Sequence, residues 1–219
     1  MTDPAGEREQ PVVIAIDGPA GAGKSTVGRA LARRLNVGYL DTGAMYRAMT
    51  FAALRRGVVE GDLDEVAAMA PTVELAVEDD RVTVDGVDAT TAIRGREVTE
   101  AVSQIAANPA VRGVLVERQR NWVDHHGGGV VEGRDIGTVV FPDADLKLYV
   151  TASPRVRAER RVRELGGDVV EVEASIIKRD RVDSSRVHSP LSEADDAVVV
   201  DTTGMSIDEV VDHILDMLP

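Results

Sequence analysis

No cysteine occurs among the 219 residues of the chain. A disulfide framework and a zinc site built on thiolates are therefore excluded, and the absence is typical of proteins from a reducing cytoplasm. The sequence also lacks an apolar run long enough to cross a bilayer. Residues 1–10 are polar and acidic, without the basic start and apolar run of a signal peptide. We expect a cytoplasmic protein that does not contact a membrane, with residues 1–10 as a flexible tail.

Positive charge is also scarce. Lysine and arginine number 25 against 38 aspartates and glutamates, which gives a net charge of −13. Such a surface repels nucleic acid over most of its area, so we exclude long polyanions as partners. Only four histidines occur, and His125 and His126 are neighbours at an expected helix end, where adjacent side chains point apart. We interpret them as a solvated pair rather than as metal ligands.

The length and composition fit one globular domain with an appendage. A chain of 219 residues is too short for two domains of ordinary size, and 43% of its residues are hydrophobic. Neither internal repeats nor low-complexity segments occur in the sequence. We place this domain, expected to be a monomer, at residues 11–219.

Buried strands alternate with helices along most of this domain. Continuous apolar runs predict strands at residues 12–17, 38–41, 130–132, 146–151 and 197–201. Helical periodicity and capping residues predict helices after Lys24, at residues 44–56, after Asn108, after Ser153 and from Ser206 to about residue 218. The pattern predicts an α/β fold with a doubly wound parallel sheet of about five strands.

One stretch departs from this alternation. Between residues 73 and 90, apolar residues alternate with polar ones, and Asp85-Gly86 has the chemistry of a hairpin turn. A helix precedes the stretch, with Asp62 as its N-cap and Glu65 three residues later. We expect a small antiparallel β insert at residues 62–96.

The clearest chemical signal is a phosphate-binding loop. Residues 18–26 fit the pattern G-x-x-x-x-G-K-[ST], after a buried strand and before a helix. These residues are Gly18, Pro19, Ala20, Gly21, Ala22, Gly23, Lys24, Ser25 and Thr26. The glycines let backbone N–H groups face a β-phosphate, Lys24 would reach the β- and γ-phosphates from a solvent-facing loop, and the Ser25 hydroxyl would hold Mg²⁺. The loop predicts binding of a nucleoside triphosphate, the alternative being a structural glycine-rich turn.

Other residues distinguish between the classes of protein that carry such a loop. A GTP-binding switch would need an N-K-x-D motif, and no asparagine of the chain is followed by lysine. A kinase of small acceptors needs a second anion site and arginines that close over the transferring phosphate. Arg47 and Arg134 are candidates for the acceptor site. We therefore favour phosphoryl transfer to a small acceptor.

Two basic clusters, at residues 155–163 and 178–186, stand out on the acidic background. Solvated helical faces are the simplest interpretation of such clusters. If the substrate is an anion, a second interpretation is favoured. In it, one face of a helix carries Arg157, Arg160 and Arg161, and these arginines belong to a lid at residues 154–170.

Several longer segments resemble bacterial cytidylate kinases. The matching segments are residues 17–24 (DGPAGAGK), 40–47 (LDTGAMYR) and 132–142 (EGRDIGTVVFP), with Ser103-Gln104, Arg112, and residues 183–186 before Pro190-Leu191. The resemblance covers nearly all of the chain after the tail, and its second and third segments are specific to that family. It implies a nucleoside monophosphate kinase fold with a core, a lid and a CMP-binding insert, Mg²⁺-ATP as phosphoryl donor, and CMP and dCMP as acceptors.

The resemblance also implies roles for individual residues. It places Thr42, Ser103, Arg112 and Asp135 around the cytosine, Arg179 and Asp183 at the sugar, Arg47, Arg134 and Arg186 near the acceptor phosphate, and Tyr46 in the same substrate site. Catalysis by direct in-line transfer would depend on Lys24, Arg134, Arg157, Arg160 and Arg161. The residue chemistry fits, because a carboxylate can accept from the cytosine amine and guanidinium groups suit phosphate oxygens.

Alternatives remain open for some of these residues. Asp183 could be a surface acid at a helix C-terminus, Ser103 a helix spacer and Tyr46 a core aromatic. Asp17 and Asp41 lie at the carboxyl ends of strands, where ligands bind in such sheets, but their sole role could be to orient loop amides. For the function, the alternatives are a kinase of UMP or another small acceptor, and a nucleotide-binding regulatory switch without transfer activity.

Overall fold

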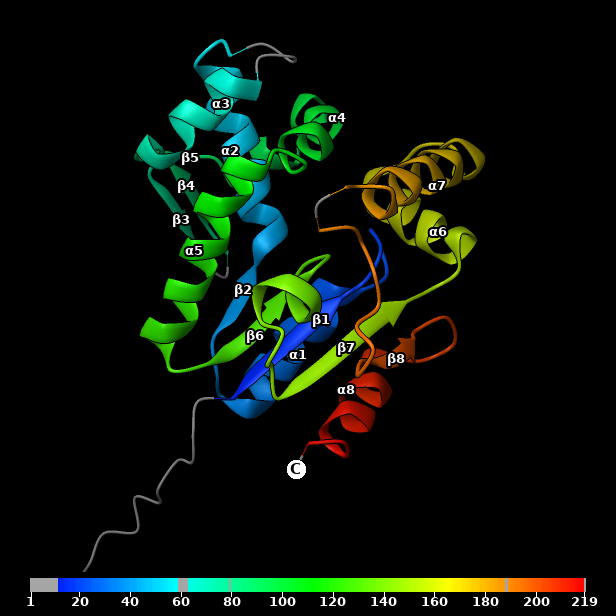
Figure 1. Cartoon of the computed structure of the whole chain (residues 1–219). Helices are drawn as coiled ribbons and strands as arrows, with labels where there is room; N and C mark the ends of the chain where they lie inside the picture. Colours follow the sequence, from blue (N-terminus) through cyan, green and yellow to red (C-terminus); the bar gives the residue numbers. More distant parts are fainter. Residues whose placement is uncertain (1–11, 59–62, 79, 188, 219) are drawn as a thin grey trace, which may run out of the picture.

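A five-stranded parallel sheet forms the centre of the protein (Figure 1). The computed structural model describes residues 12–58, 63–78, 80–187 and 189–218. The strands, in their order across the sheet, are β2 (Tyr39–Asp41), β6 (Gly129–Glu132), β1 (Val13–Asp17), β7 (Leu146–Thr151) and β8 (Val198–Asp201). The predicted doubly wound parallel sheet is confirmed. The predicted tail at residues 1–10 and the Asp62 cap lie outside the described residues.

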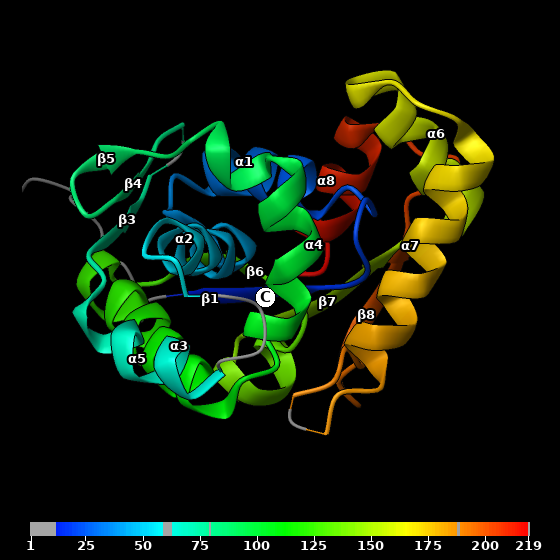
Figure 2. The ribbon, with the colours of Figure 1, turned by 90° about the horizontal axis from the view of Figure 1, so that it is seen from above.

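The central strand β1 contributes to two cores because both of its faces are covered by helices. Ile14 and Ile16 point to one side and pack in a cluster with Leu31, whereas Ala15 points to the other side. One face is covered by α1 (Lys24–Leu35) and α8 (Ile207–Leu215), and the other by α5 (Pro109–His126), while α2 (Thr42–Arg55) starts directly after β2 and packs in the same core as Ala15. Figure 2 shows α1 and α8 on the opposite side of the sheet from α5. This arrangement explains why the strands read as continuous apolar runs.

The helix starts follow the capping residues of the sequence. The Asn108 side chain accepts hydrogen bonds from two backbone N–H groups of the first turn of α5, and Ser153 accepts from Val156 at the start of α6 (Pro154–Leu165). Ser206 and Glu209 form a capping box at the start of α8. These three predicted starts are confirmed, since each cap satisfies donors that the helix itself cannot.

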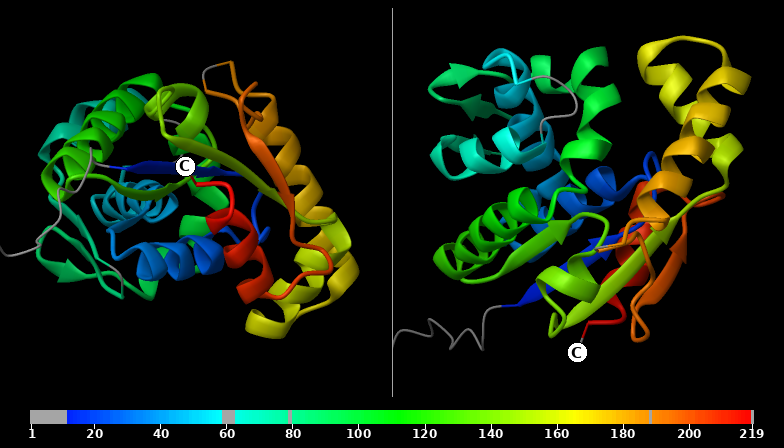
Figure 3. Two further views of the ribbon diagram at one scale, coloured as in Figure 1. Left: turned by 90° about the horizontal axis from the view of Figure 1, so that it is seen from below. Right: turned by 45° about the horizontal axis from the view of Figure 1, so that its top comes forward.

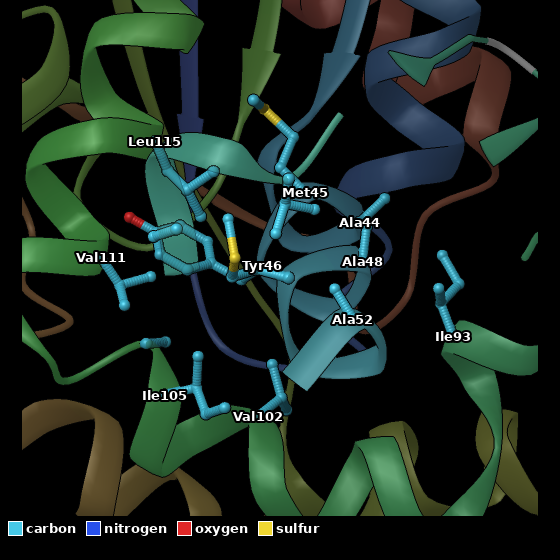
Figure 4. Packing of buried hydrophobic residues seen from close by; sticks show 14 of the residues in the cluster. Ala44, Met45, Tyr46, Ala48, Ala52, Ile93, Val102, Ile105, Val111 and Leu115 are labelled. Atoms are coloured by element: carbon cyan, nitrogen blue, oxygen red, sulfur yellow. The ribbon is translucent and has the colours of Figure 1, made fainter. Parts of the chain in front are cut away.

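The insert is a three-stranded antiparallel sheet, formed by β3 (Leu75–Val77), β4 (Val82–Val84) and β5 (Val87–Asp88). The backbone of Asp85 and Gly86 has φ values of 50° and 75° between β4 and β5, as in the hairpin turn predicted there. The flanking elements are α3 (Leu63–Met69), two 3₁₀ turns (Ala70–Thr72 and Ala92–Arg94) and α4 (Arg96–Ile105). Figure 4 shows residues of α2, α4 and α5 packed together beneath this region.

Two groups of helices rise from the same edge of the sheet, where the parallel strands end (Figures 1 and 3). One group comprises α2 to α5 with the insert. The other is the packed pair α6 and α7 (Val169–Ser184), in which α7 continues well past the predicted end of the lid at residue 170. The division of the chain into core, insert and lid remains a prediction.

Candidate active site between the two helical groups

A cleft of about 690 Å³ lies between the two helical groups, above the strand ends. Every candidate catalytic and substrate-binding residue lines it. Within the phosphate-binding loop, Gly18, Pro19 and Ala22 are not among the lining residues, whereas the other six are. The fold therefore gathers residues from most of the chain around a single space, in the position where ligands bind in sheets of this type.

The loop after β1 depends on glycine at its first position. Gly18 has φ +143°, and a Cβ atom there would lie 2.0 Å from the Val150 carbonyl oxygen of β7. No side chain fits so close to the backbone of the neighbouring strand. Gly23, with φ 94°, is the residue before the first turn of α1, so the loop delivers backbone N–H groups at a helix N-terminus.

Lys24 is more enclosed than the sequence suggested. We expected a solvent-facing lysine, but its side chain is 7% exposed and its Nζ donates to the Pro19 carbonyl at 3.0 Å. Burial lowers the pKa of Lys24, and the positive charge of Arg134 lowers it further, while Glu132 acts in the opposite direction. An incoming polyanion would strengthen the charged form of this lysine, because it adds negative charge where burial has removed water.

Ser25 and Glu132 form a pair of oxygen donors beside the loop. The Ser25 hydroxyl donates to Glu132 Oε1 at 2.7 Å, while Glu132 Oε2 is buried without a hydrogen-bond partner. Burial raises the pKa of Glu132, and the nearby Asp41 carboxylate raises it further. Carboxylate and hydroxyl oxygens suit Mg²⁺, so these residues fit that ion. Within the described ranges no group of three or more histidines or carboxylates could hold a metal by itself, so phosphate and water oxygens would have to complete the shell.

Asp17 and Asp41 both hold backbone amides. The two carboxylate oxygens of Asp17 accept from the N–H groups of Ile136 and Gly137 at 2.8 and 2.7 Å. Asp41 accepts from the Ala44 N–H at 2.9 Å and caps α2. The interpretation that these acids orient loops is therefore confirmed. Asp17 fixes the π-helical turn Ile136–Val140, which follows the candidate base-binding Asp135.

Two of the candidate base-binding residues form a buried ion pair that lines the cleft. Arg112 of α5 donates from Nη2 to Asp135 Oδ2, and both side chains are almost fully buried. The Arg112 guanidinium also lies 5.5 Å from the centre of the Tyr46 ring. Burial raises the pKa of Asp135, against the effect of Arg112. The pair presents a carboxylate and a guanidinium side by side in a dry environment, where hydrogen-bond polarity matters most.

Asp183 joins three arginines. Its carboxylate accepts from Arg134 Nε at 3.1 Å and Arg186 Nη2 at 2.5 Å, and Arg179 Nε lies 3.9 Å away. Asp183 is 1% exposed, so the alternative that it is a surface acid is wrong. Three cations share one carboxylate, and Arg134 also donates to the Gly18 carbonyl at 2.8 Å. The cluster therefore retains excess positive charge at the centre of the cleft.

Arg47 adds to this positive charge from α2. Its Nη1 donates to the Ile93 carbonyl and to the Thr99 hydroxyl, at 3.0 and 2.9 Å. Burial lowers the pKa of Arg47 to about 10, with Arg161 and Arg94 adding to the effect. Burial and Arg134 likewise lower the pKa of Arg179 to about 10. An anion between these groups would relieve their mutual repulsion.

The remaining candidates near the base differ in how they are held. The Thr42 hydroxyl donates to the Glu132 carbonyl at 2.7 Å, so it ties α2 to the end of β6. Ser103 is half-buried on α4 and lines the cleft, and its contact with the base stays a prediction. Tyr46 belongs to the hydrophobic core and also lines the cleft, which unites the two interpretations given above.

The three candidate lid arginines have different surroundings. Arg157 is buried, donates to the carbonyl oxygens of Ala152 and Ala20, and forms an ion pair with Asp180 at 2.7 Å. The Arg160 guanidinium donates to the hydroxyl oxygen of Thr202 at 3.0 Å and to the carbonyl oxygen of Thr202 at 2.8 Å. Arg161, by contrast, makes no hydrogen bond to any residue that the structure describes, and it lines the cleft half-buried.

Other residues at the site were not expected from the sequence. Arg94 lines the cleft near Arg47, Thr99 binds Arg47, and Asp180 pairs with Arg157. No sequence pattern marks them, because each acquires its partner only when separate elements pack together.

The whole chain resembles one protein family. The family model described as cytidylate kinase matches residues 14–219. A cytidylate kinase of Corynebacterium efficiens is 49% identical over 215 residues, covering 94% of this chain and 94% of that protein. One of Mycobacterium leprae is 48% identical over 212 residues, covering 94% and 95%. A bifunctional pantoate ligase/cytidylate kinase of Synechococcus sp. is 50% identical over 97% of this chain but 41% of its own length.

Solved structures share the fold. A gluconokinase from Sinorhizobium meliloti 1021 aligns with a TM-score of 0.50 at 15% sequence identity, over 95% of this chain and 92% of that one. An uncharacterized protein from Eubacterium ventriosum aligns with a TM-score of 0.51 at 14% identity, over 94% and 96%. At this level of identity the likeness concerns the fold alone. None of the helices in the described part of the chain is both long enough and apolar enough to span a membrane.

Proposed function

The chain belongs to the cytidylate kinase family, whose members are enzymes that phosphorylate CMP with ATP. We propose that this enzyme transfers the γ-phosphoryl group of ATP directly to CMP and to dCMP. The products would be ADP with CDP or dCDP. The reaction needs two nucleotides end to end, with their phosphates between the loop after β1 and the arginines around Asp183.

The single observation that carries the proposal is the buried Arg112–Asp135 pair, whose two side chains line the cleft. A carboxylate there can accept from the exocyclic amine of cytosine, and the guanidinium can donate to the ring acceptors. Uracil reverses the polarity at the same positions, so the pair favours CMP over UMP as the acceptor.

At the donor end, the backbone of the loop and Lys24 would bind the β- and γ-phosphates of ATP. The Ser25 hydroxyl and the Glu132 carboxylate would hold Mg²⁺, which when bound supplies positive charge to the phosphate oxygens. The unpartnered Oε2 of Glu132 supports this assignment. Glutamate stands here where some members of the family have aspartate, and its longer side chain reaches Ser25 directly.

Between the two ends, Arg47, Arg134 and Arg186 would bind the acceptor phosphate, and Arg179 with Asp183 the sugar. Arg161 would meet the transferring group from α6, while Arg157 and Arg160 hold α6 against the loop and the end of β8. The residues thus act by position and charge, without a covalent intermediate.

We also propose that the enzyme works as a cytoplasmic monomer on free nucleotides. The net charge of −13 opposes nucleic acid binding, and the absence of cysteine suits a reducing compartment.

Release of ADP tests the function directly. Purified protein would receive Mg²⁺-ATP with CMP, dCMP, UMP or AMP in turn, and ADP would be followed with a coupled assay. We expect rapid ADP formation with CMP and dCMP and little without an acceptor. Preference for UMP would instead support a UMP kinase, and ADP formation that ignores every acceptor would support a regulatory nucleotide-binding protein.

A further inference from the structure

A polar residue with no assigned role lies inside the core next to the acceptor site. The Gln119 side chain of α5 is 0% exposed, and neither its Oε1 nor its Nε2 has a hydrogen-bond partner. The Tyr46 hydroxyl is also buried and unpartnered. Buried polar groups without partners are costly, so their retention in one region points to a use for them.

Gln119 lies on the same face of α5 as Arg112, one member of the proposed base-binding pair. Arg112 and Gln119 are seven residues apart, which is almost two full helical turns, so both side chains leave the helix on the same side. Figure 4 shows the Tyr46 ring beside Val111 and Leu115, with its hydroxyl pointing toward α5. Arg112 lies over the same ring, 5.5 Å from its centre.

The electrostatics of Tyr46 agree with this placement. Burial raises the pKa of Tyr46 to about 12, the Asp135 carboxylate adds to the rise, and Arg112 and the nearby Gln119 side chain oppose it. The hydroxyl is therefore protonated at neutral pH and can donate to an amide oxygen. Its neighbours include both members of the ion pair and Gln119.

We propose that Gln119 is a positioning residue for base recognition, which holds the Tyr46 hydroxyl and thereby the ring on which Arg112 rests. The inference depends on the proposed function of the Arg112–Asp135 pair. Rotation of the Gln119 amide about its last bond lets its oxygen accept from the hydroxyl, which fixes the ring. A fixed ring holds the Arg112 guanidinium in one position beside the Asp135 carboxylate. The base then meets the two groups in a single geometry.

Gln119→Met removes the polar atoms and keeps the length of the side chain, and Tyr46→Phe removes only the hydroxyl. We expect each variant to lower the CMP-to-UMP ratio of kcat/KM by about fivefold, the usual effect of one neutral hydrogen bond. The KM for CMP should rise while the KM for ATP stays unchanged. The double variant should resemble either single variant, because both remove the same hydrogen bond.

Ile214→Ala is the matched control, since Ile214 is fully buried in the core on the other face of the sheet. It should lower the melting temperature and leave the ratio unchanged. The inference is overturned if Gln119→Met behaves like this control, or if the two single effects multiply in the double variant. Should Gln119→Met fail to fold, Tyr46→Phe with an unchanged ratio would overturn it equally. A wild-type protein that does not phosphorylate CMP would overturn the proposed function instead, and this inference with it.

Discussion

Replacement of Asp135 by asparagine should change which base the enzyme accepts. In the structure one carboxylate oxygen of Asp135 accepts from Arg112, and burial leaves the pair almost without solvent. An asparagine can keep the hydrogen bond to Arg112 through its carbonyl oxygen. Its NH₂ group then takes the place of the second carboxylate oxygen and turns an acceptor into a donor.

The size of the effect follows from two contacts that change together. The cytosine amine would meet another donor and lose a contact worth about 1–3 kcal/mol, while the uracil carbonyl oxygen would gain one of similar worth. Even the lower values sum to about 2 kcal/mol, or roughly a thirtyfold fall in the CMP-to-UMP ratio of kcat/KM. Asp135→Ala is the matched variant, because it removes the contact to CMP without offering a donor to UMP. It should also leave Arg112 buried and unpaired, a loss of about 3–5 kcal/mol in stability.

The assay is ADP release at saturating Mg²⁺-ATP with CMP or UMP varied. Thermal denaturation of each variant separates loss of folding from loss of recognition. If Asp135→Asn folds normally and lowers kcat/KM for CMP and for UMP by the same factor, Asp135 does not contact the base selectively. The assignment of the acceptor site then fails.

Three further predictions concern the loop and the lid. Lys24→Met keeps the buried volume and should leave the fold intact while kcat falls by about 100-fold or more; near-normal turnover in the ADP assay would contradict its role. Arg161→Ala should lower kcat more than tenfold through lost charge stabilisation, with CMP affinity and melting temperature unchanged. Arg160→Ala should also lower the melting temperature, because the Thr202 carbonyl oxygen loses the donor that Arg160 supplies. A fall in CMP affinity at constant kcat would move Arg161 to the acceptor site. Burial raises the pKa of Asp17 from its usual 3.8 to about 6, so the folded state holds the proton more tightly and loses this stability as the pH rises through 6. The unfolding free energy of wild type minus that of Asp17→Asn should fall by about 2 kcal/mol between pH 4 and 6.5. If urea titrations show no change in this difference with pH, the assignment to Asp17 is refuted.

Strands, helix starts and the loop after β1 could be predicted from the sequence, because each depends on residues that are neighbours in the chain. A parallel strand covered on both faces must be apolar throughout, as β1 is, and a helix start needs a side-chain acceptor, as Ser206 supplies for α8. The loop after β1 is likewise defined by neighbours in sequence, since Gly18 has no room for a side chain. The fold class and the small antiparallel insert were therefore predicted correctly, and phosphate binding by the loop stays a prediction.

The helix α7 was less visible in the sequence. It carries two valines at its start and charges on several sides, so its apolar face is weak, and it is held mainly by packing against α6. The prediction of a lid at residues 154–170 therefore did not include most of α7. Packing between helices decided this element, which is why no local period marked it.

Only the tertiary structure decided what the charged residues of the site touch. Ser25 meets Glu132 across 107 residues of sequence, and Asp17 binds the amides of a turn more than a hundred residues away. The sequence could place Lys24 and Asp183 in a site, but it suggested solvent around the lysine and allowed a surface position for the aspartate, and the structure buries both. Burial and pairing depend on which elements pack together, and the residue types themselves do not carry that information. The sequence thus determined which chemical groups the protein carries. The fold determined which of these groups interact, because the two helical groups bring distant carboxylates and guanidinium groups together around one cleft.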